Sequence, residues 1–327
     1  MPKKMLKVRA PAWPEKTSKF ILEKMRKPEA RFDESCRFCN INEEPVVENI
    51  PESGSFRVLE SRFPYLPQHV IITHKEHVAS IHELNFNEFA EFGKTVKKVF
   101  RAAKKEGVSL SANGNTGLIA GQTIPHLHIH LFPREVKLEK GMPLYELHKG
   151  AEFFDPLALP ILHYLKSKGS LPENAVIPKR GEGIPALILR FSSFDELFSK
   201  KGFESLQQAF AETQAAFEHL KQNPEDAVLP PGYKKEFGKQ IGKLLRERTT
   251  QGFGVNWSIR EAEDGGVELL VLPRATAIDL KDAKKRIAAL ELFANVKLHR
   301  GGLKPDEEKE WDAREKKFKG LVRKALE

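Results

Sequence analysis

The sequence predicts an α+β fold in which helices cover an antiparallel sheet. Several short runs alternate apolar with polar residues, which is the period of a β-strand with one buried face. Residues 86–105 instead repeat their apolar side chains at helical spacing. Within the first 140 residues the predicted order is strand, strand, helix, strand, strand, and this order is typical of an antiparallel α+β sheet.

Local signals support each element of the first half of the chain. We predict four strands and one helix there, at residues 56–60, 69–73, 108–112, 126–132 and, for the helix, 86–105. Phe89, Phe92 and Val96 fall on one face of the helix, which we expect to pack on the sheet. The last two strands are joined by a loop rich in glycine and asparagine, residues that favour turns.

The same pattern recurs after residue 180, which predicts a duplicated fold. The recurring elements are strands at 184–189, 253–258 and 267–274 and a helix at 204–220. Both halves contain a Pro-Arg pair after the last strand of the pattern, at 133–134 and 273–274. Aligning these pairs places Gly266, Glu268 and Leu270 opposite His126, His128 and His130. The second half therefore reads as a degenerate copy that has lost its histidines.

A chain of 327 residues exceeds the usual size of one domain, so we expect two main domains. Its predicted segments are a basic lead-in at 1–33, a catalytic domain at 34–140, a connector at 141–180, the degenerate half at 181–303 and a charged helix at 304–327. Hydrophobic residues make up 40% of the chain and charged residues 30%, as in globular proteins. This composition excludes disordered and fibrous classes.

The formal net charge of +9 favours anionic partners such as nucleotides or nucleic acid. Residues 1–30 alone carry nine Lys and Arg against three Glu. This arm is either a solvated segment or a nucleic-acid contact, although it lacks the interleaved aromatics of a stacking platform. There is no apolar run of membrane-spanning length and no secretory signal, and the two cysteines suit a reducing compartment. We therefore expect a cytoplasmic protein with no membrane association.

Three histidines, His126, His128 and His130, alternate with aliphatic residues in a single run. Because side chains alternate faces along a strand, all three imidazoles are predicted to lie on one side. The pattern is compatible with exposed histidines on an edge strand, with a three-histidine metal site, or with group transfer through a covalent histidine. The surrounding residues favour the last of these.

The stretch from Asn115 through Gly121-Gln122-Thr123 to the three histidines and Arg134 resembles the signature of the histidine triad (HIT) superfamily of nucleotide hydrolases and transferases. Residues 61–77 resemble the hairpin strand of that family, and the likeness covers residues 36–134. It implies a HIT-like fold and a nucleotide substrate, which we expect to be a purine nucleotide.

The resemblance implies a role for each residue of the signature. His128 would attack the α-phosphorus of the nucleotide and form a nucleotidyl-histidine. His130 and Gln122 would assist catalysis, and the nucleotide would be bound by Asn115, Gly121, Gln122 and Thr123. A neutral imidazole is a good nucleophile at neutral pH, and fixed donors are needed for the developing phosphate charge.

The final acceptor of the nucleotide stays open between two enzyme classes. Histidine at position 130 favours water, because family members that transfer the nucleotide to phosphate or a sugar phosphate usually carry glutamine there. The two-half length instead resembles the galactose-1-phosphate uridylyltransferase and dinucleoside tetraphosphate phosphorylase branches. We therefore expect a nucleotide hydrolase. One alternative is a nucleotidylyltransferase or phosphorylase, and the other is a non-catalytic nucleotide- or RNA-binding protein. In this reading the degenerate half replaces the second subunit of the usual homodimer.

Cys36 and Cys39 form a Cys-x-x-Cys pair, which can supply half of a tetrahedral zinc site. By resemblance to zinc-bearing HIT relatives, the other two ligands would be His77 and His126. The pair could equally be two free thiols or a redox pair. His74 is the nearest competitor of His77, while His69 and His82 are interpreted as bystanders.

Overall fold

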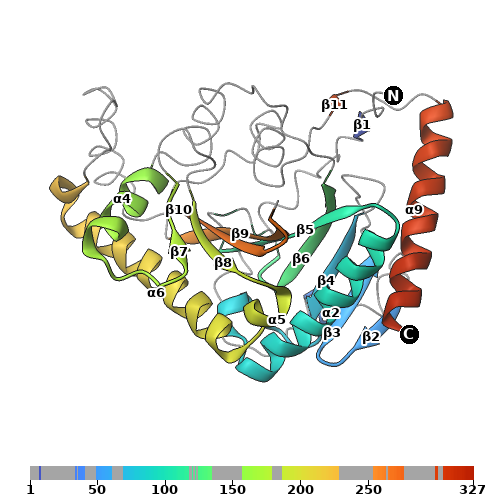
Figure 1. Cartoon of the computed structure of the whole chain (residues 1–327), viewed down its shortest axis with the longest axis horizontal. Helices are drawn as coiled ribbons and strands as arrows, with labels where there is room; N and C mark the ends of the chain where they lie inside the picture. Colours follow the sequence, from blue (N-terminus) through green and yellow to red (C-terminus); the bar gives the residue numbers. More distant parts are fainter. Residues whose placement is uncertain are drawn as a thin grey trace. The chain divides into compact units, whose positions relative to one another are not determined.

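The structure is a computed structural model of the whole chain, and its elements are labelled in Figure 1. It describes residues 7–8, 34, 36–40, 49–60, 69–117, 120, 122, 124–134, 157–178, 186–227, 253–262, 264–275, 299–300 and 305–327. The predicted basic arm, apart from residues 7–8, and residues 141–156 and 179–180 of the predicted connector lie outside these ranges. Two compact units divide the chain, with residues 1–114, 123–136 and 294–327 in unit 1 and residues 115–122 and 137–293 in unit 2.

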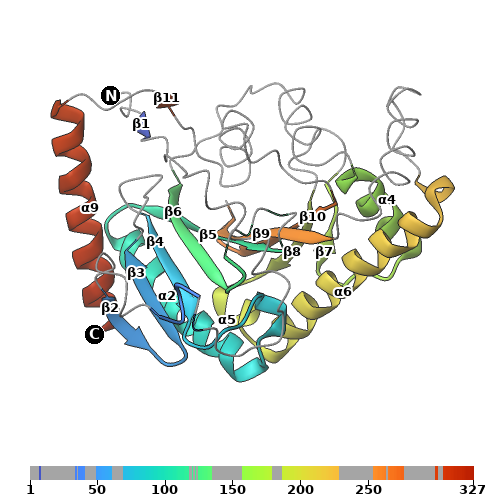
Figure 2. The same ribbon diagram turned by 180° about the vertical axis from the view of Figure 1, so that it is seen from behind.

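Unit 1 is built on antiparallel strands in the spatial order β2-β3-β4-β6-β5. Figure 2 shows β2, β3, β4 and β6 side by side. The strands are β2 (Asn49–Ser53), β3 (Phe56–Glu60), β4 (Val70–His74), β5 (Ser109–Thr116) and β6 (His128–Arg134). The last two residues of β5 belong to unit 2, which also holds the loop that follows.

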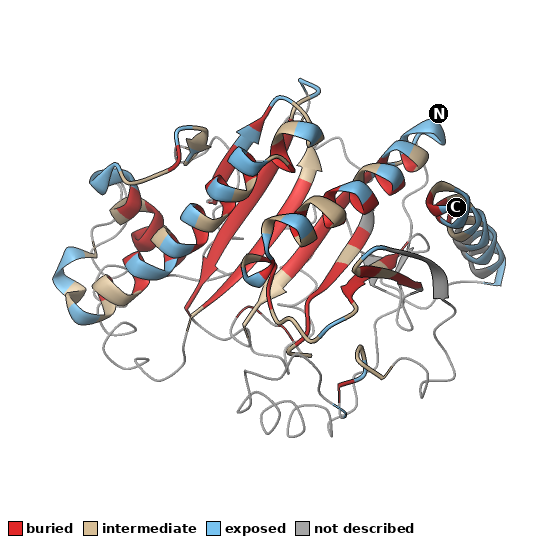
Figure 3. Ribbon diagram, turned by 90° about the horizontal axis from the view of Figure 1, so that it is seen from below, coloured by how far each residue is buried: buried red, intermediate tan, exposed pale blue. Residues whose placement is uncertain are grey.

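Helix α2 (Phe86–Lys105) packs one of its faces into the core of unit 1. It begins at a capping box, in which the Asn85 side chain accepts from the Glu88 amide and the Glu88 side chain accepts from the Asn85 amide. Phe89, Phe92 and Val96 are fully buried, as their spacing predicts. The buried side of the helix faces the strands in Figure 3, and its opposite side is exposed.

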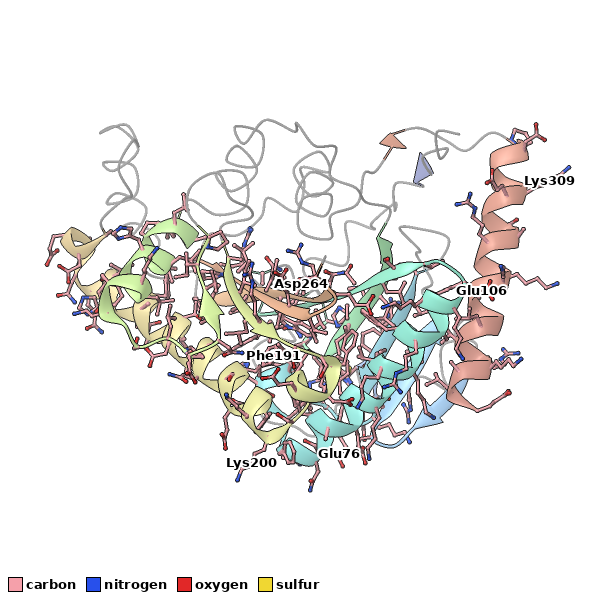
Figure 4. All side chains as sticks on the ribbon, viewed as in Figure 1. Glu76, Glu106, Phe191, Lys200, Asp264 and Lys309 are labelled. Carbon is pink, nitrogen blue, oxygen red and sulfur yellow. The ribbon has the colours of Figure 1, made fainter. Side chains whose placement is uncertain are left out.

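The C-terminal helix α9 (Pro305–Leu326) packs beside α2 in unit 1. Its residues Phe318 and Val322 are buried. Lys317 of α9 forms an ion pair of 2.5 Å with Glu106, which Figure 4 labels at the end of α2. Unit 1 also contains a short parallel pair, β1 (Lys7–Val8) with β11 (His299–Arg300), and the 3-10 helix η2 (Ile81–Glu83). The charged terminal helix is therefore one part of the unit 1 core.

Unit 2 contains antiparallel strands in the order β9-β10-β8-β7. Its elements are α4 (Ala158–Lys168), β7 (Ala175–Val176), β8 (Leu187–Phe191), α5 (Phe194–Leu197), α6 (Lys200–Gln222), η4 (Pro224–Asp226), β9 (Gly254–Glu261) and β10 (Val267–Arg274). Every residue of β10 is buried. Helix α6 begins at Ser199, whose hydroxyl accepts from the Gly202 amide.

The predicted α+β class is confirmed, because both units contain antiparallel strands with helices packed on them. Four short strands of the described residues were not predicted, β1, β2, β7 and β11. The third predicted strand extends four residues further, to Thr116. The triad strand begins at His128 and not at His126, so only two of the three histidines lie on it. Among the described residues, no helix is long and apolar enough to cross a membrane.

Candidate functional site

His128 begins the strand β6, and it is 7% exposed. Its Nδ1 lies 2.7 Å from the carbonyl oxygen of His126, which can only accept. The proton therefore sits on Nδ1, and Nε2 carries the lone pair. Burial lowers the pKa of His128, so the ring is neutral near pH 7. A neutral imidazole with an available Nε2 lone pair has the properties of a nucleophile.

His130 lies two residues further along β6, where it pairs in register with Asn113 of β5 and Ile71 of β4. Its Nδ1 lies 2.9 Å from Nε2 of His69, which directly precedes β4. Burial lowers the pKa of His69 to about 3 and holds that of His130 well below its usual range. Both rings are therefore neutral, and one proton is shared between the two facing nitrogens.

This contact shows that His69 belongs to the histidine cluster, although the sequence interpretation set it aside as a bystander. If His69 donates from Nε2, then Nδ1 of His130 accepts and the proton of His130 is on its Nε2. His130 can then donate to an anionic oxygen. The period-two pattern of the hairpin strand could have revealed this residue, because His69, Ile71 and Thr73 share one strand face and Ile71 and Thr73 pair with the triad strand.

His126 turns away from the strand toward the two cysteines. Its Nδ1 lies 3.4 Å from Sγ of Cys36 and 3.5 Å from Sγ of Cys39, and Sγ of Cys39 lies 3.4 Å from Nδ1 of His77. The four ligand atoms all lie within 4.8 Å of one another, so the group could hold a metal ion. The structure thus brings together all four predicted ligands, and His74 is not among them.

The distances fit a tetrahedral zinc ion. Zinc–sulfur and zinc–nitrogen bonds of roughly 2.3 and 2.1 Å at tetrahedral angles separate the two ligand atoms by about 3.6 Å. The observed S···N distances are 3.4 to 3.5 Å. Nε2 of His126 lies 2.8 Å from the carbonyl oxygen of His74 and must donate to it, which leaves the Nδ1 lone pair directed at the sulfurs.

The chemistry of the donors points the same way. Burial raises the pKa of the Cys36 thiol to about 12, with a further contribution from the neighbouring Cys39. Two thiolates at this place therefore require a cation to stabilise them. Cys36 and Cys39 are free cysteines, so they do not form a disulfide.

Phe38 lies between the two cysteines and contacts two rings of the triad. Its ring centroid is 5.2 Å from that of His128 and 5.5 Å from that of His126. Phe56 is fully buried against Phe92 and His74. Phe56 is therefore a core residue, whereas Phe38 is adjacent to His128.

The predicted phosphate-binding loop lies in unit 2, where Gln122 closes it. The side-chain oxygen of Gln122, a residue only 3% exposed, accepts from the amide of Gly117 at 2.8 Å. The amide of Ala120 donates to the carbonyl of Gly117 at 3.1 Å. Gly117 adopts φ +83°, a conformation that favours glycine. Gly121 and Thr123, the other two predicted nucleotide ligands, lie outside the described residues.

Asn115, half-buried at the end of β5, is held by a residue of β9 in the same unit. Asn256 Nδ2 donates to Oδ1 of Asn115 at 2.6 Å and to the carbonyl oxygen of Ala120 at 2.7 Å. Asn256 is 5% exposed. Sequence reasoning did not find this residue, because 141 positions separate it from Asn115.

The geometry agrees with comparisons to known proteins. Residues 47–137 match the model of the HIT domain. The adenosine 5'-monophosphoramidase hnt1 of Schizosaccharomyces pombe is 33% identical over 118 residues, which are 35% of this chain and 86% of the relative. The chain belongs to the HIT family. The resemblance to the HIT family is thereby confirmed, and its relatives include a protein named as a nucleotide hydrolase.

Further relatives of this HIT protein include the asymmetrical bis(5'-nucleosyl)-tetraphosphatase of S. pombe. It is 32% identical over 74 residues, which are 22% of this chain and 41% of that protein. Among solved structures, the HIT family hydrolase from Clostridium thermocellum is 29% identical, with 34% of this chain and 98% of that chain covered and a TM-score of 0.28.

Proposed function

We propose that this HIT protein is a nucleotide hydrolase that cleaves at the α-phosphate of a nucleoside phosphoramidate, polyphosphate or phosphoester. In the first step, Nε2 of His128 bonds to the α-phosphorus and the bond to the leaving group breaks; a phosphate departs as its anion, and the nitrogen of a phosphoramidate takes a proton from solvent and departs as ammonia. In the second step, the oxygen of water bonds to phosphorus, the N–P bond breaks, and a nucleoside monophosphate leaves. One proton of that water passes to solvent.

The observation that carries this proposal is the tautomer of His128. Its Nδ1–H is committed to the carbonyl of His126, so the ring presents Nε2 without a proton at neutral pH. His130 and His69 supply a neutral donor beside it, with a ring-centroid distance of 5.2 Å between His128 and His130. Asn115 and Gln122 are proposed to bind the phosphate oxygens as donors.

Water is the proposed acceptor, and the substrate is proposed to be a purine nucleotide. Histidine at position 130 supports the hydrolase over the transferase. Relatives named as an adenosine 5'-monophosphoramidase and a bis(5'-nucleosyl)-tetraphosphatase support the same class. These names describe the relatives, and the leaving group of this protein stays a prediction.

A structural zinc ion is proposed to be bound by the quartet Cys36, Cys39, His77 and His126. With four protein ligands the ion has no open position, so it would act on structure and not on the substrate. The carbonyl of His126 fixes His128, and therefore a zinc-bound His126 would also hold the nucleophile. This coupling is the contribution that we assign to the ion.

The second half is proposed to be a degenerate copy of the first. Along β6, His128 pairs with Thr73 of β4; along β10, Glu268 pairs with Arg190 of β8. The Pro-Arg alignment predicts this equivalence, since Glu268 stands in the place of His128. The spatial orders β3-β4-β6-β5 and β7-β8-β10-β9 also correspond strand by strand. We propose that this half replaces a second subunit.

The test is to incubate the full chain with adenosine 5'-phosphoramidate and, separately, a dinucleoside polyphosphate, each labelled at the α-phosphate. We expect release of the monophosphate, loss of turnover in His128→Ala, and retention in His82→Gln. His82 lies in the 3-10 helix η2, where its Nδ1 is 2.5 Å from Oγ of Ser80, and it is not one of the proposed site residues. Mass spectrometry of acid-quenched reactions should find a nucleotidyl adduct on His128.

Added inorganic phosphate or a sugar 1-phosphate separates the two enzyme classes. A transferase would form the exchanged nucleotide faster than the monophosphate, which would contradict water as the acceptor. Nucleotide binding without turnover in wild-type protein would contradict both and favour a binding protein.

A further inference from the structure

Asn115 can bind a phosphate oxygen only if its side-chain amide presents Nδ2 and not Oδ1. An unconstrained asparagine amide can rotate and offer either group. The orientation of this one side chain therefore decides whether it attracts or repels an anion. The contacts in unit 2 determine that orientation in two steps.

The first step is the orientation of Asn256. A backbone carbonyl oxygen can only accept a hydrogen bond, so the Asn256 atom 2.7 Å from the oxygen of Ala120 must be its NH₂ group. The second step follows from the shared atom. The same NH₂ group lies 2.6 Å from the side chain of Asn115, and a donor at that distance requires an acceptor. Oδ1 of Asn115 therefore faces Asn256, and Nδ2 is left as its donor.

The backbone around these residues is fitted closely enough to hold the arrangement. A Cβ atom on Gly254 would lie 2.8 Å from the carbonyl oxygen of Thr116 and 2.9 Å from the amide of Ala120. A Cβ on Gly117 would lie 3.0 Å from the carbonyl of Phe253. The start of β9 and the loop thus meet through glycines, where any other residue would force them apart. Asn256 reaches Asn115 because of this close approach.

We infer that Asn256 is a positioning residue, supplied by the second half, that fixes Asn115 as a hydrogen-bond donor to the phosphate of the substrate. The inference rests on the proposed function. The second half then contributes to the reaction through Asn256, which acts on Asn115. When the two halves are aligned by their paired strands, the first half has Ser111 at the position of Asn256. The reacting atoms are not touched by Asn256 itself.

The decisive variant is Asn256→Asp, which keeps the size of the side chain and replaces its NH₂ group with a carboxylate oxygen. The carboxylate accepts from Nδ2 of Asn115, so the Asn115 amide turns and presents Oδ1 to the phosphate. Loss of one fixed donor to a developing oxyanion lowers kcat by about 10²-fold. We expect that fall to be mainly in kcat, since the interaction strengthens in the transition state.

The matched control is Ser258→Ala, two residues further on β9. Ser258 is equally buried, and its Oγ has no hydrogen-bond partner in the described part of the chain. We expect its kcat and KM to equal those of the wild type. Melting temperatures of all variants are measured, and assays are run well below the lowest of them. Asn256→Ala serves as the second variant and should give a smaller loss, because it removes the constraint without reversing Asn115.

A double-mutant cycle separates positioning from structure. If Asn256 acts through Asn115, Asn256→Asp should have almost no further effect on kcat in an Asn115→Ala background. Equal and additive effects in both backgrounds would overturn the inference, as would wild-type kcat in Asn256→Asp. If the wild type has no turnover, the proposed function fails. Exchange of the Asn256 side-chain amide protons, measured by NMR, then decides the positioning, since rapid exchange contradicts it.

Discussion

Replacing His69 tests whether the pair of neutral histidines carries the donor of the site. His69→Leu removes the imidazole that lies 2.9 Å from Nδ1 of His130. The proton of His130 can then sit on either nitrogen, and only one of the two tautomers donates to a phosphate oxygen. A buried hydrogen bond contributes about 1–1.5 kcal/mol, and 1.4 kcal/mol corresponds to a factor of about 10 in rate. We therefore expect kcat to fall about 5- to 10-fold.

The matched variant is His69→Gln, whose side-chain NH₂ group can still donate to Nδ1 of His130. We expect it to recover most of the lost kcat, whereas a purely structural role would make both variants alike. The assay is the initial rate of monophosphate release at saturating substrate, with KM measured in parallel. Equal kcat in wild type and His69→Leu would refute the tautomer argument, and so would a loss of the same size in both variants.

Three further predictions follow from the metal quartet, the buried histidines and the glycine contacts. Cys39→Ser should lose bound zinc, measured by elemental analysis, and unfold at a lower temperature, whereas His82→Gln should retain the metal. Because burial places the pKa of His69 at about 3 when folded and near 6.5 when unfolded, its contribution to stability is complete above pH 6.5. Stability falls below that pH, by up to about 1.4 kcal/mol per pH unit, so the denaturant midpoint of wild type should drop more steeply than that of His69→Gln. Gly254→Ala should lower the free energy of unfolding by about 1–3 kcal/mol through overpacking, whereas Gly320→Ala, which meets nothing within 4 Å on α9, should be neutral or stabilising.

The elements that the sequence predicts best are those specified by local signals. The helix over 86–105 was predicted with the bounds that the structure has, because its apolar residues repeat at helical spacing. The strand Val267–Arg274 was likewise predicted with its observed bounds. Strand β2, with the sequence Asn-Ile-Pro-Glu-Ser, was missed because it has no alternating pattern. Its pairing with β3 supplies what the local sequence lacks.

The residues of the site likewise fall into those that the local sequence indicates and those that depend on tertiary structure. Residue type and spacing indicated the three histidines of the triad and the Cys36/Cys39 pair, and the resemblance to the HIT family added His77 and His126 as metal ligands. The roles of His69 and Asn256 depend on which strands lie next to each other, and that register is a nonlocal property. The place of His126 shows the limit of the period-two pattern. Its backbone precedes the strand and its ring lies beside the two cysteines, so alternation alone could not separate the proposed metal ligand from the proposed nucleophile.

If the second half is a degenerate copy, as we propose, strand β10 shows which residues take the places of the triad histidines. At the position that corresponds to His128, the buried carboxylate of Glu268 accepts from Arg260 at 2.7 and 3.0 Å and lies 3.4 Å from Arg190. Where His130 would stand, Leu270 packs in an apolar cluster with Ile188. The Glu268 carboxylate is committed to structure, because loss of its guanidinium partners would leave a buried charge uncompensated. Under the proposed duplication these positions of β10 serve the sheet, and the proposed effect of the second half on catalysis passes through contacts such as that of Asn256 with Asn115.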